Sequence, residues 1–239
     1  MAGGTLYLIP VPLGDTPPRR VLPAPVLDIA VALDCFVAED AKSARAFLKA
    51  AGVTKPLREI GISEIKASST PEDINALLSP LRAGRDVGLL SEAGCPAVAD
   101  PGAALVAEAH RRGIRVVPLV GPSSTVLALM ASGLNGQNFA FCGYLPINEA
   151  ERGRRILELE EFSRRSGQTQ IFIETPFRNV QLLATLLKSC RPDTRLCVAR
   201  ELTLDGEWIA TRTVREWRAA PPPELARRPA VFLLLGKAG

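Results

Sequence analysis

Short, uninterrupted aliphatic runs are the feature of this sequence that most limits its fold. Four of them lie in the first half of the chain, at Thr5–Pro10, Cys35–Ala38, Val87–Leu90 and Arg115–Val120. Runs without polar alternation are typical of parallel strands that are buried on both faces. Helical patterns separate these runs, at residues 42–51, 70–83 and 100–113. The alternation predicts βαβ units and an open parallel sheet.

Two of these helices carry a signal for their first residue. Thr70 is followed by Pro71 in the first turn and by Asp73 three residues after the cap, and Asp100 is followed directly by Pro101. A small polar residue before a proline is typical of a helix N-terminus. We therefore expect Thr70 and Asp100 to cap their helices.

The spacing of the strands changes after about residue 120. Long, charged helical stretches at 149–165 and 179–189 now separate the apolar segments, which lie at Phe139–Gly143, Gln170–Glu174, Arg195–Arg200 and Val231–Leu235. The sequence therefore predicts an α/β protein of two α/β domains. Residues 1–119 are expected to form the open parallel sheet, and residues 120–239 a mixed sheet.

Composition excludes several classes of function. Only 5% of the residues are aromatic, which argues against a surface that binds single-stranded nucleic acid by stacking bases. A net charge of +4 is too small to indicate nucleic-acid binding by itself. The five cysteines include no Cys-x-x-Cys pair, and His110 is the single histidine, expected at a solvated helix end. We expect no disulfide, no metal site and a cytoplasmic protein.

One stretch is long enough to raise the question of a membrane span. Residues 116–148 form a run of 33 without a charged side chain. Gly121-Pro122-Ser123-Ser124 and Asn135-Gly136-Gln137-Asn138 interrupt it with turn residues and polar groups. We therefore expect two buried strands that flank an internal helix, and no membrane span. The chain also begins without a basic-then-apolar leader, which agrees with a cytoplasmic location.

The segments that follow the first-half strands are rich in glycine, proline and acidic residues. They lie at residues 10–15, 39–40, 91–102 and 121–125. Ligands of open α/β sheets bind outside the carboxyl ends of the strands, and Gly/Pro-rich loops leave backbone groups accessible there. This suits a ligand such as an adenosine, although each loop alone also fits a tight βα turn. No Gly-x-Gly-x-x-Gly follows a strand and no P-loop motif occurs, so standard nucleotide sites are not expected.

A series of short motifs runs in order along most of the chain. They are Gly4-Thr5-Leu6-Tyr7, Pro10-Val11-Pro12-Leu13-Gly14, Ala38-Glu39-Asp40, Ser91-Glu92-Ala93-Gly94-Cys95-Pro96, Ala99-Asp100-Pro101-Gly102, Val120-Gly121-Pro122-Ser123, Ala131-Ser132-Gly133-Leu134, Glu174-Thr175-Pro176-Phe177-Arg178 and Ala199-Arg200-Glu201-Leu202-Thr203. Together they resemble the tetrapyrrole methylase superfamily, the class III S-adenosylmethionine-dependent methyltransferases. Within it, they are most similar to enzymes that methylate a cytidine ribose 2′-hydroxyl in small-subunit ribosomal RNA.

The resemblance implies a fold and a cofactor. It implies two α/β domains with S-adenosylmethionine in the cleft between them, usually in a homodimer, and no metal. Transferred position by position, the donor contacts are Leu13, Gly94, Cys95, Pro96, Val98, Ser123, Ser124, Ile173 and Ala199.

Departures from the RNA-modifying pattern lie mainly on the acceptor side. Asp15 stands where those enzymes usually carry Asn, Ala41-Lys42 replaces Thr-Arg, Cys95 replaces Thr, and Leu204 replaces a basic residue. We also expect no counterpart of the C-terminal segment that many RNA-modifying members carry. Three hypotheses therefore stay open. In the first, the partner is ribosomal RNA or a small-subunit particle. In the second, the acceptor is a small molecule such as a tetrapyrrole. In the third, the protein binds the donor without catalysis.

The candidate acceptor-side residues are mostly charged. They are Asp15, Glu39, Asp40, Glu92, Arg178, Arg200 and Glu201. A ribose hydroxyl needs a proton acceptor, for which Glu39, Asp40, Glu92 and Glu201 are candidates that the sequence does not rank. Glu39 and Asp40 can instead cap the next helix.

Arginines offer the same kind of choice. Arg178 and Arg200 can bind a phosphate or carboxylate group, or pair with Glu174 or Glu201. The arginines of the helix at 149–165 can follow an RNA backbone, but the glutamates among them favour a solvated face of mixed charge.

Overall fold

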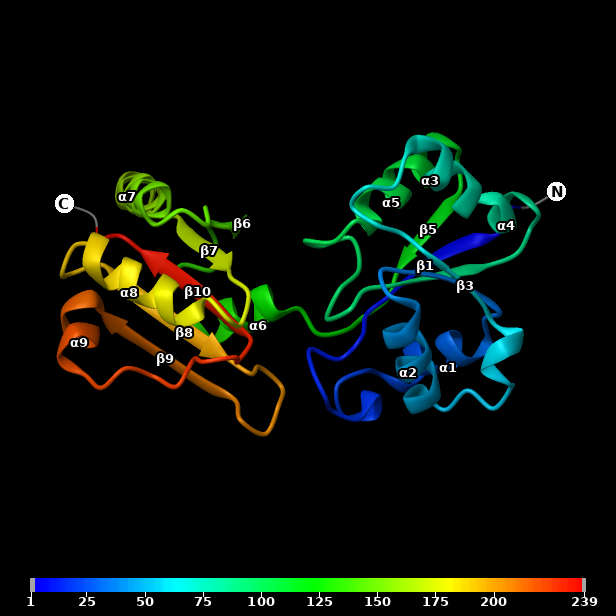
Figure 1. Ribbon diagram of the computed structural model, residues 1–239, viewed down its shortest axis with the longest axis horizontal. Coiled ribbons are helices and arrows are strands. Elements are labelled where there is room, and N and C mark those ends of the chain that lie inside the picture. The colour runs from blue at the N-terminus through cyan, green and yellow to red at the C-terminus, as the bar shows by residue number, and fades with distance from the viewer. Residues whose placement is uncertain (1–2, 238–239) are drawn as a thin grey trace. The chain divides into compact units, whose positions relative to one another are not determined.

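The computed structural model describes residues 3–237, in two compact units, Met1–Ser123 (unit 1) and Ser124–Gly239 (unit 2) (Figure 1). Each unit contains one five-stranded sheet, parallel in unit 1 and mixed in unit 2. The predicted α/β architecture with one parallel and one mixed sheet is therefore confirmed.

Unit 1 has five parallel strands in the order β3-β2-β4-β1-β5. Its strands are β1 (Thr5–Ile9), β2 (Cys35–Ala38), β3 (Gly61–Glu64), β4 (Val87–Leu90) and β5 (Arg115–Pro118). Its helices are η1 (Pro18–Arg20), α1 (Ala24–Ala32), α2 (Ala41–Ala51), η2 (Leu57–Glu59), α3 (Pro71–Leu77), α4 (Ser79–Arg82) and α5 (Gly102–Arg111).

Two hydrophobic cores cover the two faces of this sheet. Ile9, Phe36 and Leu90 face α1 and α2, whereas Leu6, Val37 and Leu89 face α3, α4 and α5. Figure 1 shows the two helical layers on opposite sides of the strands. The inner strands β1, β2 and β4 are continuous aliphatic runs because both of their faces are covered.

The strand order of unit 1 creates a switch point between β1 and β4. These strands are neighbours, but the chain leaves β1 for α1 on one face of the sheet and leaves β4 for α5 on the other face. Connections that diverge in this way open a crevice at the carboxyl ends of the two strands, where open α/β sheets bind their ligands. The loops after β1 and β4 lie at this crevice.

Unit 2 has its strands in the order β6-β7-β10-β8-β9, parallel between β6 and β7 and antiparallel elsewhere. The strands are β6 (Phe139–Tyr144), β7 (Thr169–Ile173), β8 (Arg195–Arg200), β9 (Trp208–Thr213) and β10 (Ala230–Leu235). The helices are α6 (Ser124–Ser132), α7 (Glu149–Ser166), α8 (Asn179–Ser189) and α9 (Val214–Ala219).

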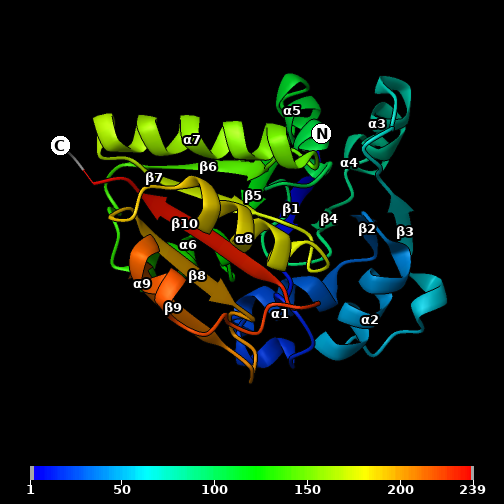
Figure 2. The same cartoon turned by 60° about the vertical axis from the view of Figure 1, so that its left-hand side comes forward.

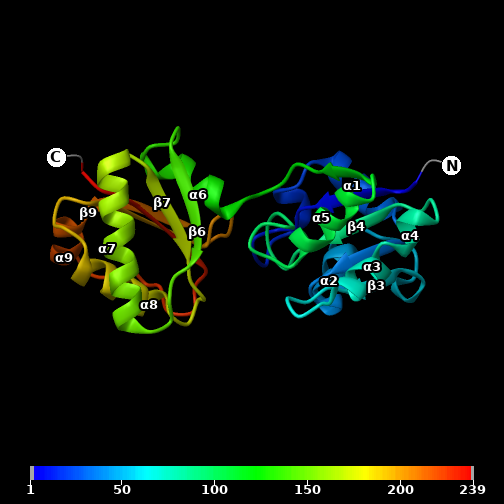
Figure 3. The same ribbon diagram turned by 90° about the horizontal axis from the view of Figure 1, so that it is seen from above.

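The core of unit 2 lies between its sheet and the helices α7, α8 and α9. Phe172 of β7 and Phe232 of β10 stack in its centre, with ring centroids 6.2 Å apart. The Trp217 indole of α9 donates a hydrogen bond of 2.8 Å to the Leu196 carbonyl. Helix α7 packs across β7 and β10 and beside α8 (Figure 3). Helix α6 lies behind β8 and β10 in Figure 2, on the other face of the sheet.

Two strands were not predicted, and both lie at the edge of a sheet. In β3, Ile62 is the one large apolar residue, and β9 mixes polar and apolar residues along its length. Neither carries the continuous apolar run on which the strand predictions depended, unlike the other two edge strands, β5 and β6.

The helix boundaries also differ from the predictions. The predicted helix at 70–83 is divided into α3 and α4, with Pro80 in the first turn of α4. Proline has no backbone N–H and disfavours a helical residue before it, which explains the break. Thr70 caps α3 in a capping box with Asp73, as predicted. The short helices α1 and α9 were not predicted. No helix among residues 3–237 is long and apolar enough to cross a membrane.

Replacing Phe232 with alanine should destabilise unit 2. The ring is completely buried and stacked on Phe172, so its removal leaves a cavity that costs about 3–5 kcal/mol of unfolding free energy. Denaturant unfolding followed by tryptophan fluorescence measures this directly, since both tryptophans of the chain, Trp208 and Trp217, lie in unit 2. Phe177→Ala is the control, because this ring is 75% exposed and its loss should change stability by less than about 0.5 kcal/mol.

Candidate functional site

Three loops of unit 1 are joined at the carboxyl edge of its sheet. Val11, after β1, and Gly94, after β4, exchange two backbone hydrogen bonds, of 2.9 and 3.2 Å. The Cys95 thiol donates to the Pro122 carbonyl, after β5, over 3.4 Å. The loops that the sequence singled out at 10–15, 91–102 and 121–125 therefore meet through direct contacts of residues in unit 1.

Close backbone approach holds these loops together. A Cβ atom at Gly121 would lie 2.3 Å from Cβ of Pro10, so a larger residue cannot occupy this position without a shift. At Gly94, where φ is +74°, a Cβ atom would lie 3.1 Å from Cδ2 of Leu13. Glycine is thus required at Gly121 for space and favoured at Gly94 for conformation as well.

The loop after β4 is held in an unusual backbone conformation. Ala97 and Ala99 have φ values of 65° and 60°, which cost non-glycine residues energy and occur often at ligand sites. The Asp100 carboxylate stabilises the loop by accepting hydrogen bonds from the Ala97 and Gly102 amides, of 2.9 and 2.8 Å. Between the two alanines, Val98 is 51% exposed and offers an apolar contact to a ligand.

Asp100 differs from its predicted role. The structure begins α5 at Gly102 with Pro101 as the cap residue, whose side chain accepts no hydrogen bond. Asp100 precedes the helix. Its carboxylate accepts hydrogen bonds both from the amide of Gly102, the first residue of α5, and from the amide of Ala97 in the preceding loop. The sequence pattern located the start of the helix to within a residue or two, but did not reveal that Asp100 shapes the loop.

Three carboxylates interact at this edge of unit 1. Burial raises the pKa of Glu39, and the negative charges of Glu92 and Asp100 raise it further. Burial also raises the pKa of Asp100, although its two backbone hydrogen bonds act in the opposite direction. Within residues 3–237, no cation forms an ion pair with Glu39. A carboxylate with a raised pKa and no cation is suited to accept a proton near neutral pH.

Two other predicted acceptor-side residues of unit 1 are placed differently. Asp40 caps α2, since its carboxylate accepts from the Ser43 amide at 2.6 Å and from the Ser43 hydroxyl at 2.7 Å. These hydrogen bonds lower the pKa of Asp40. Of the two capping alternatives, the structure thus selects Asp40 and leaves Glu39 uncommitted. Asp15 and Glu92 are both exposed, in the loops after β1 and β4.

The chemistry of these loops fits an adenosine-containing donor. They offer backbone groups, the half-buried Leu13, the buried Pro96 and the exposed Val98, with little side-chain charge apart from the carboxylates. Burial raises the pKa of Cys95, so this residue is a neutral thiol at neutral pH and not a thiolate nucleophile. No cluster of three or more His, Cys, Asp or Glu side chains suited to a metal occurs in the described part of the chain.

A second set of loops meets at the edge of unit 2 where β7 and β8 end. The Glu201 amide donates to the Pro229 carbonyl at 2.9 Å, and the Arg227 amide donates to the Pro176 carbonyl at 3.1 Å. The Asn179 side chain donates to the Arg228 carbonyl at 2.6 Å. The segments 174–179, 201–207 and 227–229 thus form one connected group.

The ion pairs of this edge correct one expectation. Arg178 pairs with Glu174 at 2.6 Å, one of the predicted alternatives. Glu201 pairs with Arg228, also at 2.6 Å, and not with Arg200. The Arg200 guanidinium instead lies 5.5 Å from the Trp208 ring centroid and 3.8 Å from the carboxylate of Glu224. Arg200 and Glu201 are consecutive, but Glu201 lies just beyond β8 with a φ of 50°, so the chain turns there.

Buried polar atoms without a partner concentrate at this edge. Six buried side-chain atoms of the described residues lack a hydrogen bond, and five of them lie here: Glu174 Oε2, Arg178 Nε, Asn179 Oδ1, Arg200 Nε and Thr203 Oγ1. Native proteins satisfy most such groups, so a cluster of them indicates a place for water or a ligand. The predicted residues Arg178 and Arg200 both belong to this cluster.

The remaining predicted donor contacts differ in accessibility. Ser123 ends unit 1, and Ser124 begins α6 in unit 2. Ile173 is the half-buried last residue of β7. Ala199 is completely buried in β8 between β10 and β9, so it offers a ligand much less than Ile173 does.

Two charged residues of α7 were placed wrongly by the sequence pattern, and one of them, Glu160, is 2% exposed. Arg152 is 5% exposed, whereas the arginines of this helix were expected on a solvated face. Arg155, Arg164 and Arg165 do form ion pairs with glutamates of α7. Arg152 shares the buried face with Ile156 and Leu159, at the spacing i, i+4, i+7. This spacing in the sequence could have predicted that Arg152 lies on the buried face of α7.

Sequence comparisons identify relatives of this chain. The family model for tetrapyrrole (corrin/porphyrin) methylases matches residues 5–217. A Mesorhizobium japonicum protein named ribosomal RNA small subunit methyltransferase I is 34% identical over 210 residues, which are 88% of this chain and 67% of that protein. Its namesake from Pseudomonas aeruginosa is 32% identical over 90% of this chain and 72% of its own length. That of Escherichia coli O157:H7 is 30% identical over 97% and 77%.

Solved structures agree on the fold. A cobalamin biosynthetic enzyme, cobalt precorrin-4 methyltransferase, superposes with a TM-score of 0.62 at 18% identity, over 97% of this chain and 94% of its own. The uroporphyrin-III-C-methyltransferase of Thermus thermophilus gives 0.55 at 21% identity, over 99% and 93%. With the family model matched over most of its length, the chain belongs to the tetrapyrrole methylase family and is a methyltransferase whose methyl donor is S-adenosylmethionine.

Proposed function

We propose that this methyltransferase transfers the methyl group to RNA of the small ribosomal subunit, at a ribose 2′-hydroxyl. The observation that carries the proposal is the similarity, at 30–34% identity over most of this chain, to proteins named for methylation of small-subunit ribosomal RNA. We propose in addition that the enzyme is a cytoplasmic homodimer, which the family resemblance supports.

The donor site of the proposal uses the loops at the carboxyl edge of unit 1. Its contacts are Leu13, Gly94, Cys95, Pro96, Val98, Ser123 and Ser124, with Ile173 and, to a lesser extent, the buried Ala199. Support comes from the Val11–Gly94 backbone pairing and from the left-handed residues around Val98, which fix the direction of the backbone groups. The bound donor supplies a sulfonium methyl group that is open to in-line attack.

The proton of the ribose hydroxyl is accepted, in this proposal, by Glu39. Asp40 is occupied in capping α2, and Glu201 is paired with Arg228, which leaves Glu39 and Glu92 as acceptors without a cation. Glu39 is the half-buried one, and its raised pKa increases its strength as a base. The donor held by these loops would supply the methyl group to the ribose oxygen, and Glu39 would take up the proton of that hydroxyl.

The edge of unit 2 supplies acceptor contacts in this proposal. Arg178 Nε and Arg200 Nε are buried donors without a partner, and they suit the oxygens of a ribose or a phosphate group. The Arg178–Glu174 and Arg228–Glu201 pairs hold the loops in place. Asp15 and Glu92, exposed in unit 1, are the more peripheral members of the acceptor set.

A small-molecule acceptor is the second candidate. The solved structures named above act on tetrapyrroles, but at 18–21% identity they carry the fold and not the substrate. The acceptor assay below separates the two candidates.

The RNA acceptor is tested by transfer of labelled methyl groups. Small ribosomal subunits and naked ribosomal RNA from a strain that lacks this protein should take up label from S-adenosylmethionine, and nuclease digestion should recover it as a 2′-O-methylated nucleoside. Subunits from the parent strain, already modified, are the control and should take up little. Label found only in a tetrapyrrole-containing small-molecule extract would overturn the RNA proposal.

Replacing Gly121 with alanine should weaken donor binding. The new Cβ would press on Pro10 and separate the loops after β1 and β5, at a cost of about 1–3 kcal/mol in stability and about tenfold in affinity for S-adenosylmethionine. Calorimetric titration and thermal unfolding measure the two effects. The matched control is Gly136→Ala, where no atom lies within 4 Å of the added Cβ. Equal donor affinity in Gly121→Ala and wild type would remove these loops from the donor site.

Replacing Glu39 with glutamine separates catalysis from stability. The kcat should fall by about 10²-fold and lose its acidic limb, because the proton acceptor is gone. Thermal stability should rise at neutral pH. Folding raises the pKa of Glu39, so its ionised form destabilises the folded protein at pH values above the ordinary pKa of a glutamate. Glutamine removes this cost, and the gain in thermal stability therefore disappears below about pH 4.

Glu92→Gln is the control for this prediction. It removes one of the negative charges that raise the pKa of Glu39, so the acidic limb should move to lower pH. A Glu39→Gln enzyme with the kcat and pH profile of the wild type would eliminate Glu39 as the base.

A further inference from the structure

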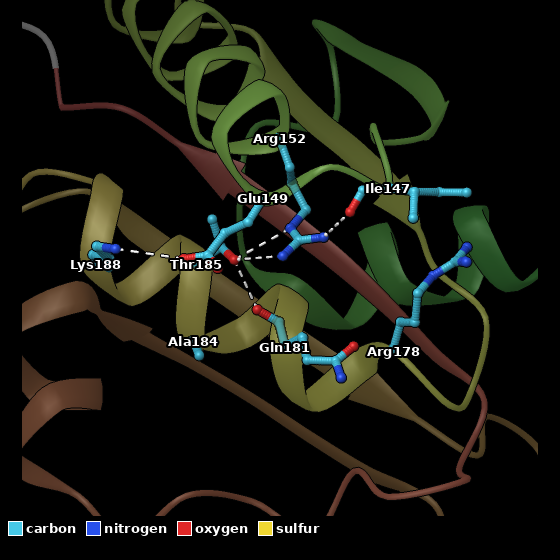
Figure 4. Close-up of a pocket in the computed structure, with 8 residues that line it drawn as sticks. All are labelled: Ile147, Glu149, Arg152, Arg178, Gln181, Ala184, Thr185 and Lys188. Atoms are coloured by element: carbon cyan, nitrogen blue, oxygen red, sulfur yellow. Dashed lines mark hydrogen bonds and ion pairs between the residues drawn. The ribbon is translucent and has the colours of Figure 1, made fainter.

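A cavity of about 430 Å³ lies between α7 and α8 of unit 2 (Figure 4). Its lining residues are Ile147, Glu149, Arg152, Arg178, Gln181, Ala184, Thr185 and Lys188. Three of these are cations and one is a carboxylate. The cavity therefore differs in charge from the rest of α7, where arginines and glutamates are equal in number.

Arg152 is the central feature of the cavity. Its Nε and Nη2 atoms donate to the Thr185 hydroxyl oxygen at 3.2 and 3.1 Å, and Nη1 donates to the Ile147 carbonyl at 3.0 Å. All three acceptors are neutral, and across residues 3–237 no carboxylate forms an ion pair with Arg152. A guanidinium buried to 5% exposure without a counter-charge is costly, and an anion bound in the cavity would reduce that cost.

Unused donors face the same cavity. A guanidinium has five N–H groups, so the three hydrogen bonds of Arg152 leave two of them without an acceptor. Arg178 also lines the cavity, but its Nη2 is paired with Glu174 and its Nε is buried away from any accessible space. Arginine donors in this arrangement match the oxygens of a phosphate group.

The balance of charges points to a single negative charge. Lys188 is paired with Glu149 at 3.4 Å, and Arg178 is paired with Glu174 at 2.6 Å. Arg152 is then the one lining cation without a carboxylate. A phosphodiester carries one negative charge, whereas a free phosphate or a terminal phosphate carries between one and two at neutral pH. The exposed Ile147, beside the cavity, offers an apolar surface to the sugar or base next to a phosphodiester.

We propose that the cavity between α7 and α8 binds a backbone phosphate of the RNA acceptor, with Arg152 as its main charge partner. This rests on the proposed function, and it adds a contact that positions the RNA and takes no part in the chemistry. Removal of the contact should raise KM and leave kcat unchanged, because binding to the backbone is the same before and during methyl transfer.

The experiment measures KM for small ribosomal subunits, from a strain without this protein, as a function of salt. Each phosphate contact contributes about 0.7–0.9 to the slope of log affinity against log salt. Arg152→Gln should raise KM by about tenfold at 0.1 M salt and reduce the slope by about 0.7–0.9. Arg152→Lys keeps the positive charge and should restore most of the affinity and of the slope.

Two exposed variants protect the test against misfolding of the buried Arg152 variants. Lys188→Ala leaves Glu149 unpaired and should raise KM about threefold, whereas Glu149→Gln leaves Lys188 unpaired and should lower KM about twofold. Lys66→Ala is the matched control. Lys66 is similarly exposed and pairs with Glu64 at 3.5 Å, but in unit 1, so its loss should leave KM and the slope unchanged.

The outcomes are distinguishable. Opposite shifts in KM for Lys188→Ala and Glu149→Gln, at constant kcat, support the proposal. The phosphate contact is overturned if the wild type methylates RNA but neither the Arg152 variants nor the variants of Lys188 and Glu149 change the salt dependence of KM. That result leaves the proposed function intact. Inorganic phosphate that stabilises the wild type but not Arg152→Gln, with an unchanged KM for RNA, assigns the cavity to free phosphate and overturns the backbone assignment. If the wild type methylates no RNA, the proposed function is overturned, and with it the assignment of the cavity to a backbone phosphate of RNA.

Discussion

The paired hydrogen bonds between Val11 and Gly94 are the constraint on which the site of unit 1 depends. They connect the ends of β1 and β4, the two neighbouring strands from which the chain departs in opposite directions. A divergent pair of strands leaves an open crevice, and without a connection the two loops would be free to move there. The contact of Gly121 with Pro10 adds the loop after β5, so three loops share one geometry.

The two units prepare their edges for ligands in different ways. In unit 1 the loops position backbone groups, with Asp100 fixing the left-handed turn around Val98 and Glu39 held near two like charges. In unit 2 the edge has ion pairs and buried side-chain donors and acceptors without partners. Backbone groups suit a donor that is the same for every member of a family, whereas side chains can be exchanged to suit different acceptors. This agrees with a fold that serves several substrates.

How far the sequence predicted the structure depended on burial. Strands buried on both faces, such as β4, were predicted because nothing interrupts their aliphatic runs, whereas the edge strands β3 and β9 carry no such signal. The loops of the candidate site were predicted from their glycines and prolines. Contacts between residues far apart in the chain were not, because spacing says nothing of which side chain comes close. The role of Arg152 and the Glu201–Arg228 pair depend on such contacts. Asp100 was misjudged for a different reason, because its hydrogen bonds to Ala97 and Gly102 are local but depend on the left-handed loop conformation.

Cys95 illustrates how a departure from a family pattern can preserve geometry. The family resemblance places a threonine here, and the expectation was that departures concern the acceptor. In the structure the Cys95 thiol donates to the Pro122 carbonyl and connects the loops after β4 and β5, a bond that a hydroxyl in its place would also make. Because burial keeps the thiol neutral, it adds no charge to the site. The substitution therefore concerns how the loops after β4 and β5 are joined, and it leaves their contact intact.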